Sequence, residues 1–280
     1  MAAHEKESNN IITETHHLEA LRNAPTTDNV VVPRAVFEKL CANPNGGGSL
    51  RKKFGNPAPI ALIGFLLAGM PLSCDLMGWR GTGGEKGALG PVFILTAGLV
   101  QVLAAIGEWI LGNTFTCALF FTFGTFWLSL GAGLLPSFAI GAAYSPTGDS
   151  LEGQTTPAFL AATGFYYVAI TILSVVFTVC SLRTNLCLFS ALLLLDVAFG
   201  CFAGVYFELA LGNAQLAERL RVVAGAFVFA LCMIIWYIFI VQMLESVDFP
   251  FTLPLGDLST YIRGKSEKLQ RTQGVASECE

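Results

Sequence analysis

Six long apolar stretches, separated by short polar segments, constrain the fold of this chain more than any other feature. A helix needs about 20 consecutive apolar residues to cross the hydrocarbon core of a membrane. Only 13% of the 280 residues are charged and 54% are hydrophobic, whereas soluble domains carry about 25% charged residues. We therefore predict an all-α polytopic membrane protein with six transmembrane helices. The predicted spans are 58–77, 88–110, 114–135, 158–180, 184–206 and 220–244.

The polar segments divide the chain into three regions. We predict a polar, disordered cytosolic tail at 1–50, a membrane domain at 51–258 and a second cytosolic tail at 259–280. Cytosolic segments carry an excess of Lys and Arg, and the first span follows a basic flank. We therefore expect both termini to be cytosolic, together with the short turns at 111–113 and 181–184. The cytosolic side then holds Arg51, Lys52, Lys53, Arg183 and the basic C-terminal tail, and the other side holds Arg80, Lys86, Arg219 and Arg221.

The spans lack the residues that membrane enzymes and retinal proteins need. All three His lie in the first 50 residues, no Lys occurs between Lys86 and Lys265, and the spans contain no paired acids. The eight Cys form neither a CxxC pair nor a Cys/His cluster, so we expect no metal, no cofactor and no enzymatic activity. The net charge of −4 argues against a nucleic-acid partner.

Three of the predicted spans begin on the cytosolic side with residues that favour a helix start. Proline costs little in a first turn, and an Asn side chain can accept hydrogen bonds from the free N–H groups there. The fifth span, for example, starts at Thr184-Asn185, which offers such an Asn side chain. Because helix N-termini carry partial positive charge, three of them on one face predict an inner mouth that attracts small anions. The other residues of this mouth are Asn56, Pro57, Pro59, Asn113 and Thr114.

Polar residues within the spans are candidates for the pathway, because charges in a membrane usually face a bundle interior or a cavity. Asp196 near the middle of the fifth span either carries protons or lines the substrate path, or it forms a structural hydrogen bond to a neighbouring helix or protomer. Glu108 lies near the cytosolic end of the second span, where it lines the path or is simply solvated. Gln101 and Thr122 are further candidates for a polar path. We find no convincing sequence repeat.

Three motifs, in order along the chain, carry a resemblance to a known family. They are Asn56-Pro57-Ala58-Pro59-Ile60-Ala61-Leu62, Gly112-Asn113-Thr114-Phe115 and Leu253-Pro254-Leu255-Gly256-Asp257. Over roughly residues 50–260 the chain resembles the acetate uptake transporter family, which includes bacterial succinate–acetate permeases and fungal acetate permeases. The resemblance implies a hexamer of six-helix protomers. Each protomer would pass acetate and related small monocarboxylates across the plasma membrane, by proton symport or as an anion channel.

The resemblance also implies a constriction formed by Phe65, Phe123 and Leu195. The family usually has Tyr at the second of these positions and Leu-Gly where this chain has Ile60-Ala61, so the substrate preference could differ. Counted from their helix starts, the three side chains lie roughly 9, 14 and 17 Å from one face. They can therefore form one ring near the middle of the bilayer.

Two other functions remain open from the sequence. The protein could be a membrane sensor or regulator that binds carboxylic acids without moving them, although neither tail contains a visible effector module. It could also export ammonium, although a dedicated ammonia pore is disfavoured by the absence of His from the spans.

Overall fold

The computed structural model describes residues 54–83 and 87–258. The predicted tails, the flank 51–53 and Lys86 lie outside these residues. Within the described part, six helical segments are long and apolar enough to cross a membrane, which confirms the predicted fold class. They are α4 (Ala58–Leu76), Val92–Leu99 continued by α5 (Val100–Ile110), α6 (Thr114–Gly133), α8 (Pro157–Ser181), α9 (Leu186–Ala210) and α10 (Ala214–Ser246).

The last helix is longer than predicted. It has 33 residues and begins at Ala214 rather than at 220. Asn213 caps it, because its Oδ1 accepts a hydrogen bond from Leu216 N, and Arg221 pairs with Glu218 at 2.6 Å one turn further on. The predicted boundary was wrong because these charged residues lower the local hydropathy without interrupting the helix.

The second span has an irregular first half. Val92–Leu99 is π-helical and follows Pro91, and regular α-helix begins only at Val100. Ala88 and Leu89, which we expected to belong to the span, form a separate 3₁₀ turn together with Gly87. A wider helical turn changes the direction in which the following side chains point, so the register of this span does not follow from a uniform period of 3.6 residues.

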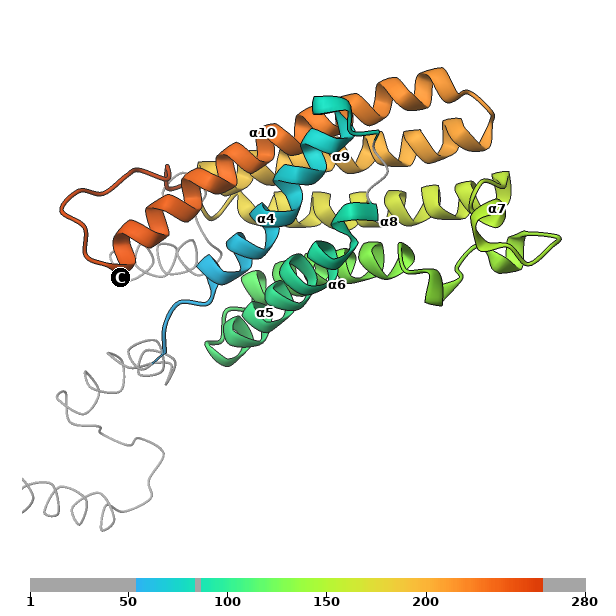
Figure 1. The fold of residues 1–280 in the computed structure, drawn as a ribbon. Helices are drawn as coiled ribbons and strands as arrows, with labels where there is room; N and C mark the ends of the chain where they lie inside the picture. Colours follow the sequence, from blue (N-terminus) through green and yellow to red (C-terminus); the bar gives the residue numbers. More distant parts are fainter. Residues whose placement is uncertain (1–53, 84–86, 259–280) are drawn as a thin grey trace, which may run out of the picture. The chain divides into compact units, whose positions relative to one another are not determined.

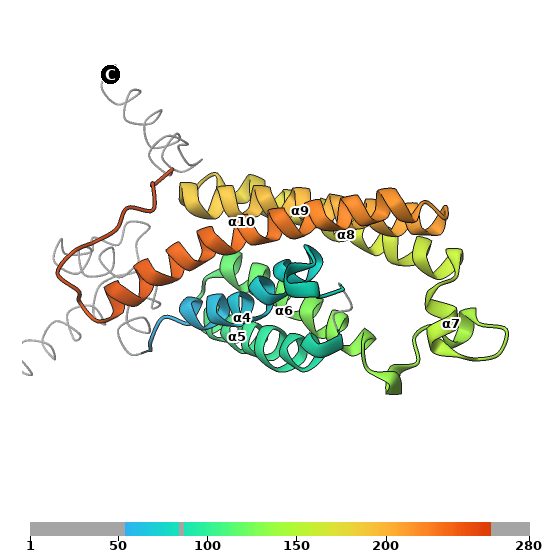
Figure 2. The ribbon, with the colours of Figure 1, turned by 45° about the horizontal axis from the view of Figure 1, so that its top comes forward.

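The six helices form a ring that is closed at one place by side chains alone. Neighbouring backbones pack in the order α6, α5, α4, α10, α9, α8 (Figures 1 and 2). Between α8 and α6 the contact is aromatic. Phe177 of α8 meets Phe115 and Phe123 of α6 edge-on, with ring centroids 6.2 and 6.0 Å apart. Large side chains therefore hold these two helices apart, and space remains inside the ring.

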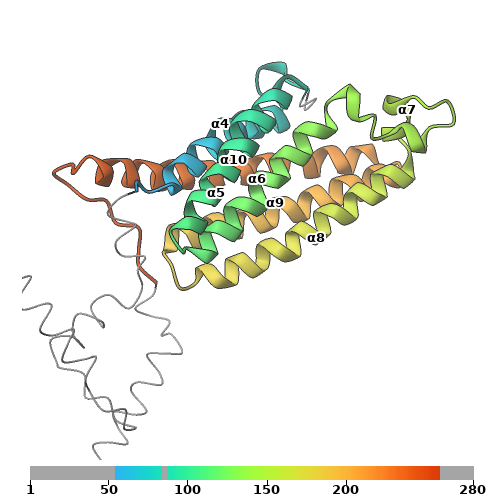
Figure 3. The same cartoon turned by 90° about the horizontal axis from the view of Figure 1, so that it is seen from below.

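The bundle has two distinct ends. Helices α4, α6 and α9 begin at one end, which we call the inner end, following the predicted orientation. The short helix α7 (Ser150–Gln154) lies at the opposite, outer end (Figure 3). The segment before α7 is held by Glu152, whose carboxylate accepts hydrogen bonds from Ser145 and Thr147. These hydrogen bonds lower the pKa of Glu152.

Contrary to our expectation, the chain contains a repeat, and its clearest trace is in two turns. Glu-x-x-Leu-Gly-Asn occurs at 108–113 and again at 208–213. In each turn the Asn N–H donates to the Glu carbonyl oxygen, at 2.9 and 2.8 Å, and the Asn amide donates to the Glu carboxylate. The Gly residues of both turns need a positive φ, +78° and +79°.

The same spacing relates the helices on either side of these turns. Pro57-Ala58 and Gly64-Phe65 of α4 correspond to Pro157-Ala158 and Gly164-Phe165 of α8. Helix α4 begins at the inner end and α8 at the outer end, so the second set of three helices runs in the opposite direction to the first. The two halves share only a few identical residues. The repeat is recognisable because the two Glu-x-x-Leu-Gly-Asn turns have the same hydrogen bonds.

Candidate substrate pathway

Three chambers follow one another along the inside of the ring. The inner chamber offers about 250 Å³ to the centres of water molecules, the middle chamber about 30 Å³ and the outer chamber about 180 Å³. The inner chamber is bounded by α4, α6, α9 and α10, and the outer one by α6, α8 and residues near α7. A route that joins the two ends of the bundle therefore narrows strongly in the middle.

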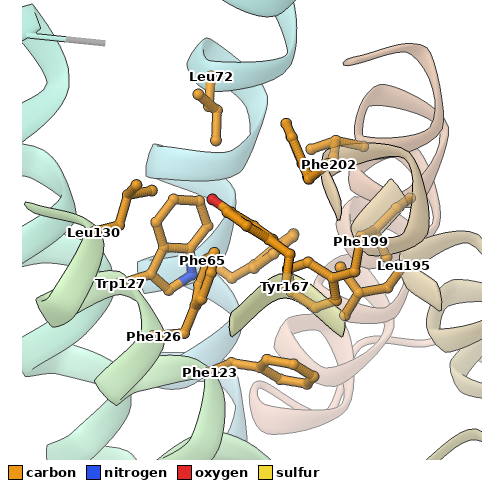
Figure 4. A pocket seen from close by; sticks show the side chains of 12 residues that line it. Phe65, Leu72, Phe123, Phe126, Trp127, Leu130, Tyr167, Leu195, Phe199 and Phe202 are labelled. Atoms are coloured by element: carbon orange, nitrogen blue, oxygen red, sulfur yellow. The ribbon is translucent and has the colours of Figure 1, made fainter. Parts of the chain in front are cut away.

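The predicted constriction residues meet at the boundary between the inner and middle chambers. Phe65, Phe123 and Leu195 line both chambers. Phe65 packs edge-on against Trp127, with ring centroids 6.1 Å apart. Phe123 stacks on Phe199 at 6.2 Å. We call these three side chains the inner ring (Figure 4).

The inner chamber contains two amide side chains with unused hydrogen-bonding capacity. Among the described residues, the Oε1 atoms of Gln101 and Gln242 are buried and have no hydrogen-bond partner. Gln101 is only 2% exposed, and both side chains line the chamber together with the Thr116 hydroxyl. An amide can donate to a carboxylate through nitrogen or accept from a carboxylic acid through oxygen. Gln101 was predicted, whereas Gln242 and Thr116 were missed.

The inner mouth differs from the expected set of free helix N-termini. The Asn56 carboxamide oxygen accepts from Ala58 N at 3.1 Å, and Pro57 and Pro59 have no N–H to offer. The N–H groups of Ile60 and Ala61 already donate to the Pro57 carbonyl. Asn56 therefore organises the start of α4 as predicted, but the first turn has little left with which to bind an anion.

The start of α9 is also occupied, by a strap at 253–258 near the end of the described chain. Leu186 N donates to the Gly256 carbonyl at 2.7 Å, and Cys187 N donates to the Leu255 carbonyl at 3.4 Å. Leu188 N donates to the cap residue Asn185 at 2.8 Å. This contact was not predicted, because the strap is far from α9 in the chain.

Glu108 is buried rather than solvated. It is 2% exposed, and its Oε2 accepts from the Asn113 amide and, at 2.8 Å, from the Thr116 hydroxyl. The side chain of Asn113 thus ties the α5–α6 turn and does not cap α6. Thr114 is the first residue of α6. This cluster fixes Thr116, which lines the inner chamber.

Asp196 and Thr122 lie outside the three chambers. Asp196 accepts at Oδ2 from the Thr178 hydroxyl of α8, at 2.7 Å. Its Oδ1 is buried and lacks a partner within the described part of the chain. Thr122 is partly exposed on α6 and lines none of the chambers. The structure therefore favours the helix-to-helix interpretation of Asp196.

The outer half of the route is lined by residues that the sequence analysis did not identify. Phe126, Leu130 and Tyr167 line both the middle and the outer chamber, and we call them the outer ring. The run Phe165-Tyr166-Tyr167 was an available signal, because Tyr combines an apolar ring with a polar tip. Which of these side chains points into the route could not be inferred from the sequence.

Comparison with known proteins identifies the family. The sequence matches the model of the GPR1/FUN34/yaaH family over residues 42–260. The chain belongs to this family. Among its relatives in the family, Protein alcS of Aspergillus fumigatus is 39% identical over 246 residues, covering 86% of this chain and 89% of the relative. Acetate transporter protein patA of Aspergillus clavatus is 31% identical, covering 73% and 79%.

A solved structure agrees with this assignment. The bacterial acetate channel SatP superposes with a TM-score of 0.57 at 25% identity, covering 72% of this chain and 99% of that one. The resemblance to the acetate uptake transporter family is thereby confirmed. The protein is a multi-pass membrane protein of this family.

Proposed function

We propose that each protomer conducts acetate and related small monocarboxylates through its own chambers, and that protomers assemble as hexamers. One observation carries the proposal: a water-sized route, in which the buried Oε1 atoms of Gln101 and Gln242 lack a hydrogen-bond partner among the described residues, leads to an apolar ring at Phe65, Phe123 and Leu195. The amides can hold a carboxyl group beside the ring. The names of patA and SatP support acetate as the substrate class.

The ring restricts which acids can pass. Moving a carboxylate out of water into an apolar space is expensive, and a dicarboxylate would have to lose water from two charged groups. A small acid with one carboxyl group meets the lower barrier. The carboxyl group is either protonated on the way or crosses as an anion, and these alternatives correspond to proton symport and to a channel.

Labelled acetate uptake into liposomes that contain the purified protein tests the proposal. Leu195→Trp should block the ring, because Leu195 is 8% exposed and lines two chambers. Leu193→Trp is the matched control, since Leu193 lies on the outside of the same helix and is 48% exposed. We expect uptake well above that of protein-free liposomes for the wild type and Leu193→Trp, and about tenfold less for Leu195→Trp, equivalent to about 1.4 kcal/mol of added barrier.

A pH gradient distinguishes the two modes. Uptake that follows the gradient supports symport, and uptake that ignores it supports a channel. Acetate that binds to the protein without entering the liposomes would contradict transport and support a sensor. Permeation of ammonium without acetate would support the ammonium alternative.

A further inference from the structure

The middle chamber has a second boundary, at its outer end. Its outer limit is the outer ring of Phe126, Leu130 and Tyr167, just as its inner limit is the inner ring. The chamber between them offers only about 30 Å³ to water centres. Since one water needs about 10–15 Å³ by this measure, an acid cannot carry its hydration shell through this segment.

Tyr167 is held rigidly at this second boundary. Its side chain is 4% exposed and stacks on Tyr206 of α9, with ring centroids 5.2 Å apart and an interplanar angle of 16°. On its other side Phe126 of α6 packs edge-on at 6.2 Å and 76°. Tyr167 thus fills the gap between α8 and α6, the place where the ring of helices is closed by side chains.

The Tyr167 hydroxyl is a polar group in an otherwise apolar segment, where it forms a hydrogen bond with the Tyr206 hydroxyl. Of the twelve residues that line the middle chamber, only Tyr167 and Trp127 carry a polar side-chain atom. In Figure 4 the Tyr167 hydroxyl points toward the side of the chamber lined by α4 and α6. Phe123, at the inner ring, has no hydroxyl. A carboxyl group that leaves the outer chamber therefore meets Tyr167 before it reaches the apolar space.

We infer that Phe126, Leu130 and Tyr167 form a second constriction in series with the inner ring, and that the Tyr167 hydroxyl binds the carboxyl group as it crosses. The inference rests on the proposed transport of monocarboxylates and adds to it a residue that determines specificity. Two comparable barriers in series both limit the flux, so trimming one of them leaves the other to limit the rate.

The role of the hydroxyl is tested with Tyr167→Phe, which keeps the ring and its packing. Tyr166→Phe is the matched control, because Tyr166 lines the outer chamber but not the middle one. Tyr167→Phe removes the hydrogen bond that the hydroxyl makes to the substrate as it crosses the barrier. This loss should slow acetate uptake about five- to tenfold. Tyr166→Phe should change uptake less than about twofold. Equal effects, or no effect of either change, would overturn the role of the hydroxyl.

The second constriction is tested with Leu195→Ala in the inner ring, Leu130→Ala in the outer ring, and the double variant. Lactate uptake into liposomes is the readout, because lactate is larger than acetate. For barriers in series, each single change leaves the other ring in place, so each should raise lactate uptake only slightly. The double variant should raise it by more than the product of the two single effects.

The outcomes separate this inference from the proposed function. If the wild type conducts acetate, and Leu130→Ala adds nothing to Leu195→Ala, the outer ring is no barrier and only the inference fails. If the wild type conducts no more acetate than protein-free liposomes, the proposed function fails and the inference fails with it. A melting temperature of the detergent-solubilised alanine variants close to that of the wild type shows that they are folded.

Discussion

Gln101 is a polar side chain held in an otherwise apolar wall. A buried polar atom without a partner costs about 1–3 kcal/mol. Within the described part of the chain, Gln101 Oε1 is such an atom. Packing gains nothing from this arrangement, because an apolar side chain of similar size would fill the space. A substrate that supplies the missing hydrogen bond gives a physical reason for an amide here.

Gln101→Leu separates binding from packing. Removing the buried Oε1 that lacks a partner should leave the melting temperature of the detergent-solubilised protein unchanged or raise it. Acetate uptake should fall about tenfold, since the lost hydrogen bond to the substrate is worth about 1.4 kcal/mol or more. Gln154→Leu, at the outer chamber, serves as the control for a general loss of polarity. A lower melting temperature of Gln101→Leu with normal uptake per folded molecule would assign Gln101 to the structure instead.

At the scale of elements, the two Glu-x-x-Leu-Gly-Asn turns have the same hydrogen bonds but different surroundings. Glu108 is buried and also accepts from Thr116, whereas Glu208 lies in a more exposed turn and accepts from Asn213. The inner turn joins α5 and α6 beside the inner chamber, and the outer turn joins α9 and α10 at the other end. The same sequence motif therefore has a larger structural effect at the inner end.

The repeat supplies its own control for this difference. Glu108→Ala removes the carboxylate that accepts from the Asn113 amide and the Thr116 hydroxyl, which costs about 1–3 kcal/mol and should lower the melting temperature by several degrees. Glu208→Ala should lower it by no more than about a degree or two, because exposed groups contribute little. Thermal denaturation of both variants in one detergent measures the difference. Equal shifts would show that burial does not distinguish the two turns.

At the scale of the whole molecule, one of the six helix-to-helix contacts in the ring is made by side chains rather than by closely packed backbones. Backbones pack closely from α6 through α5, α4, α10 and α9 to α8, and aromatic side chains fill the remaining contact between α8 and α6. The two rings of the route contain side chains from this contact. Movement of a few aromatic side chains can therefore open the route without changing the order of the helices.

The orientation of the molecule is a separate prediction. An even number of spans places both termini on one side, and the excess of Lys and Arg places that side in the cytosol. Epitope tags at both ends should be protected from protease in intact cells and cleaved after permeabilisation. A tag in the segment 145–149, before α7, should be cleaved in intact cells. Cleavage of either terminal tag from outside would contradict this orientation.

Much of the architecture follows from the sequence, because the bilayer imposes a length on every span. The six apolar stretches, the prolines at the start of α4 and the cap at Asn185 are local features, and the structure has each of them. The meeting of Phe65, Phe123 and Leu195 was predictable from a family motif together with their depths.

The tertiary structure decided which apolar and polar side chains face the route. Lipid is as apolar as a protein core, so hydrophobicity does not distinguish a Phe in the outer ring from one that faces lipid. Three other features depend on contact with a second segment of the chain, either one distant in sequence or one that folds back after a turn. They are the burial of Glu108, the contact of Asp196 with α8 and the strap over α9. The sequence determined how many helices cross the membrane, and packing between those helices determined where the route lies.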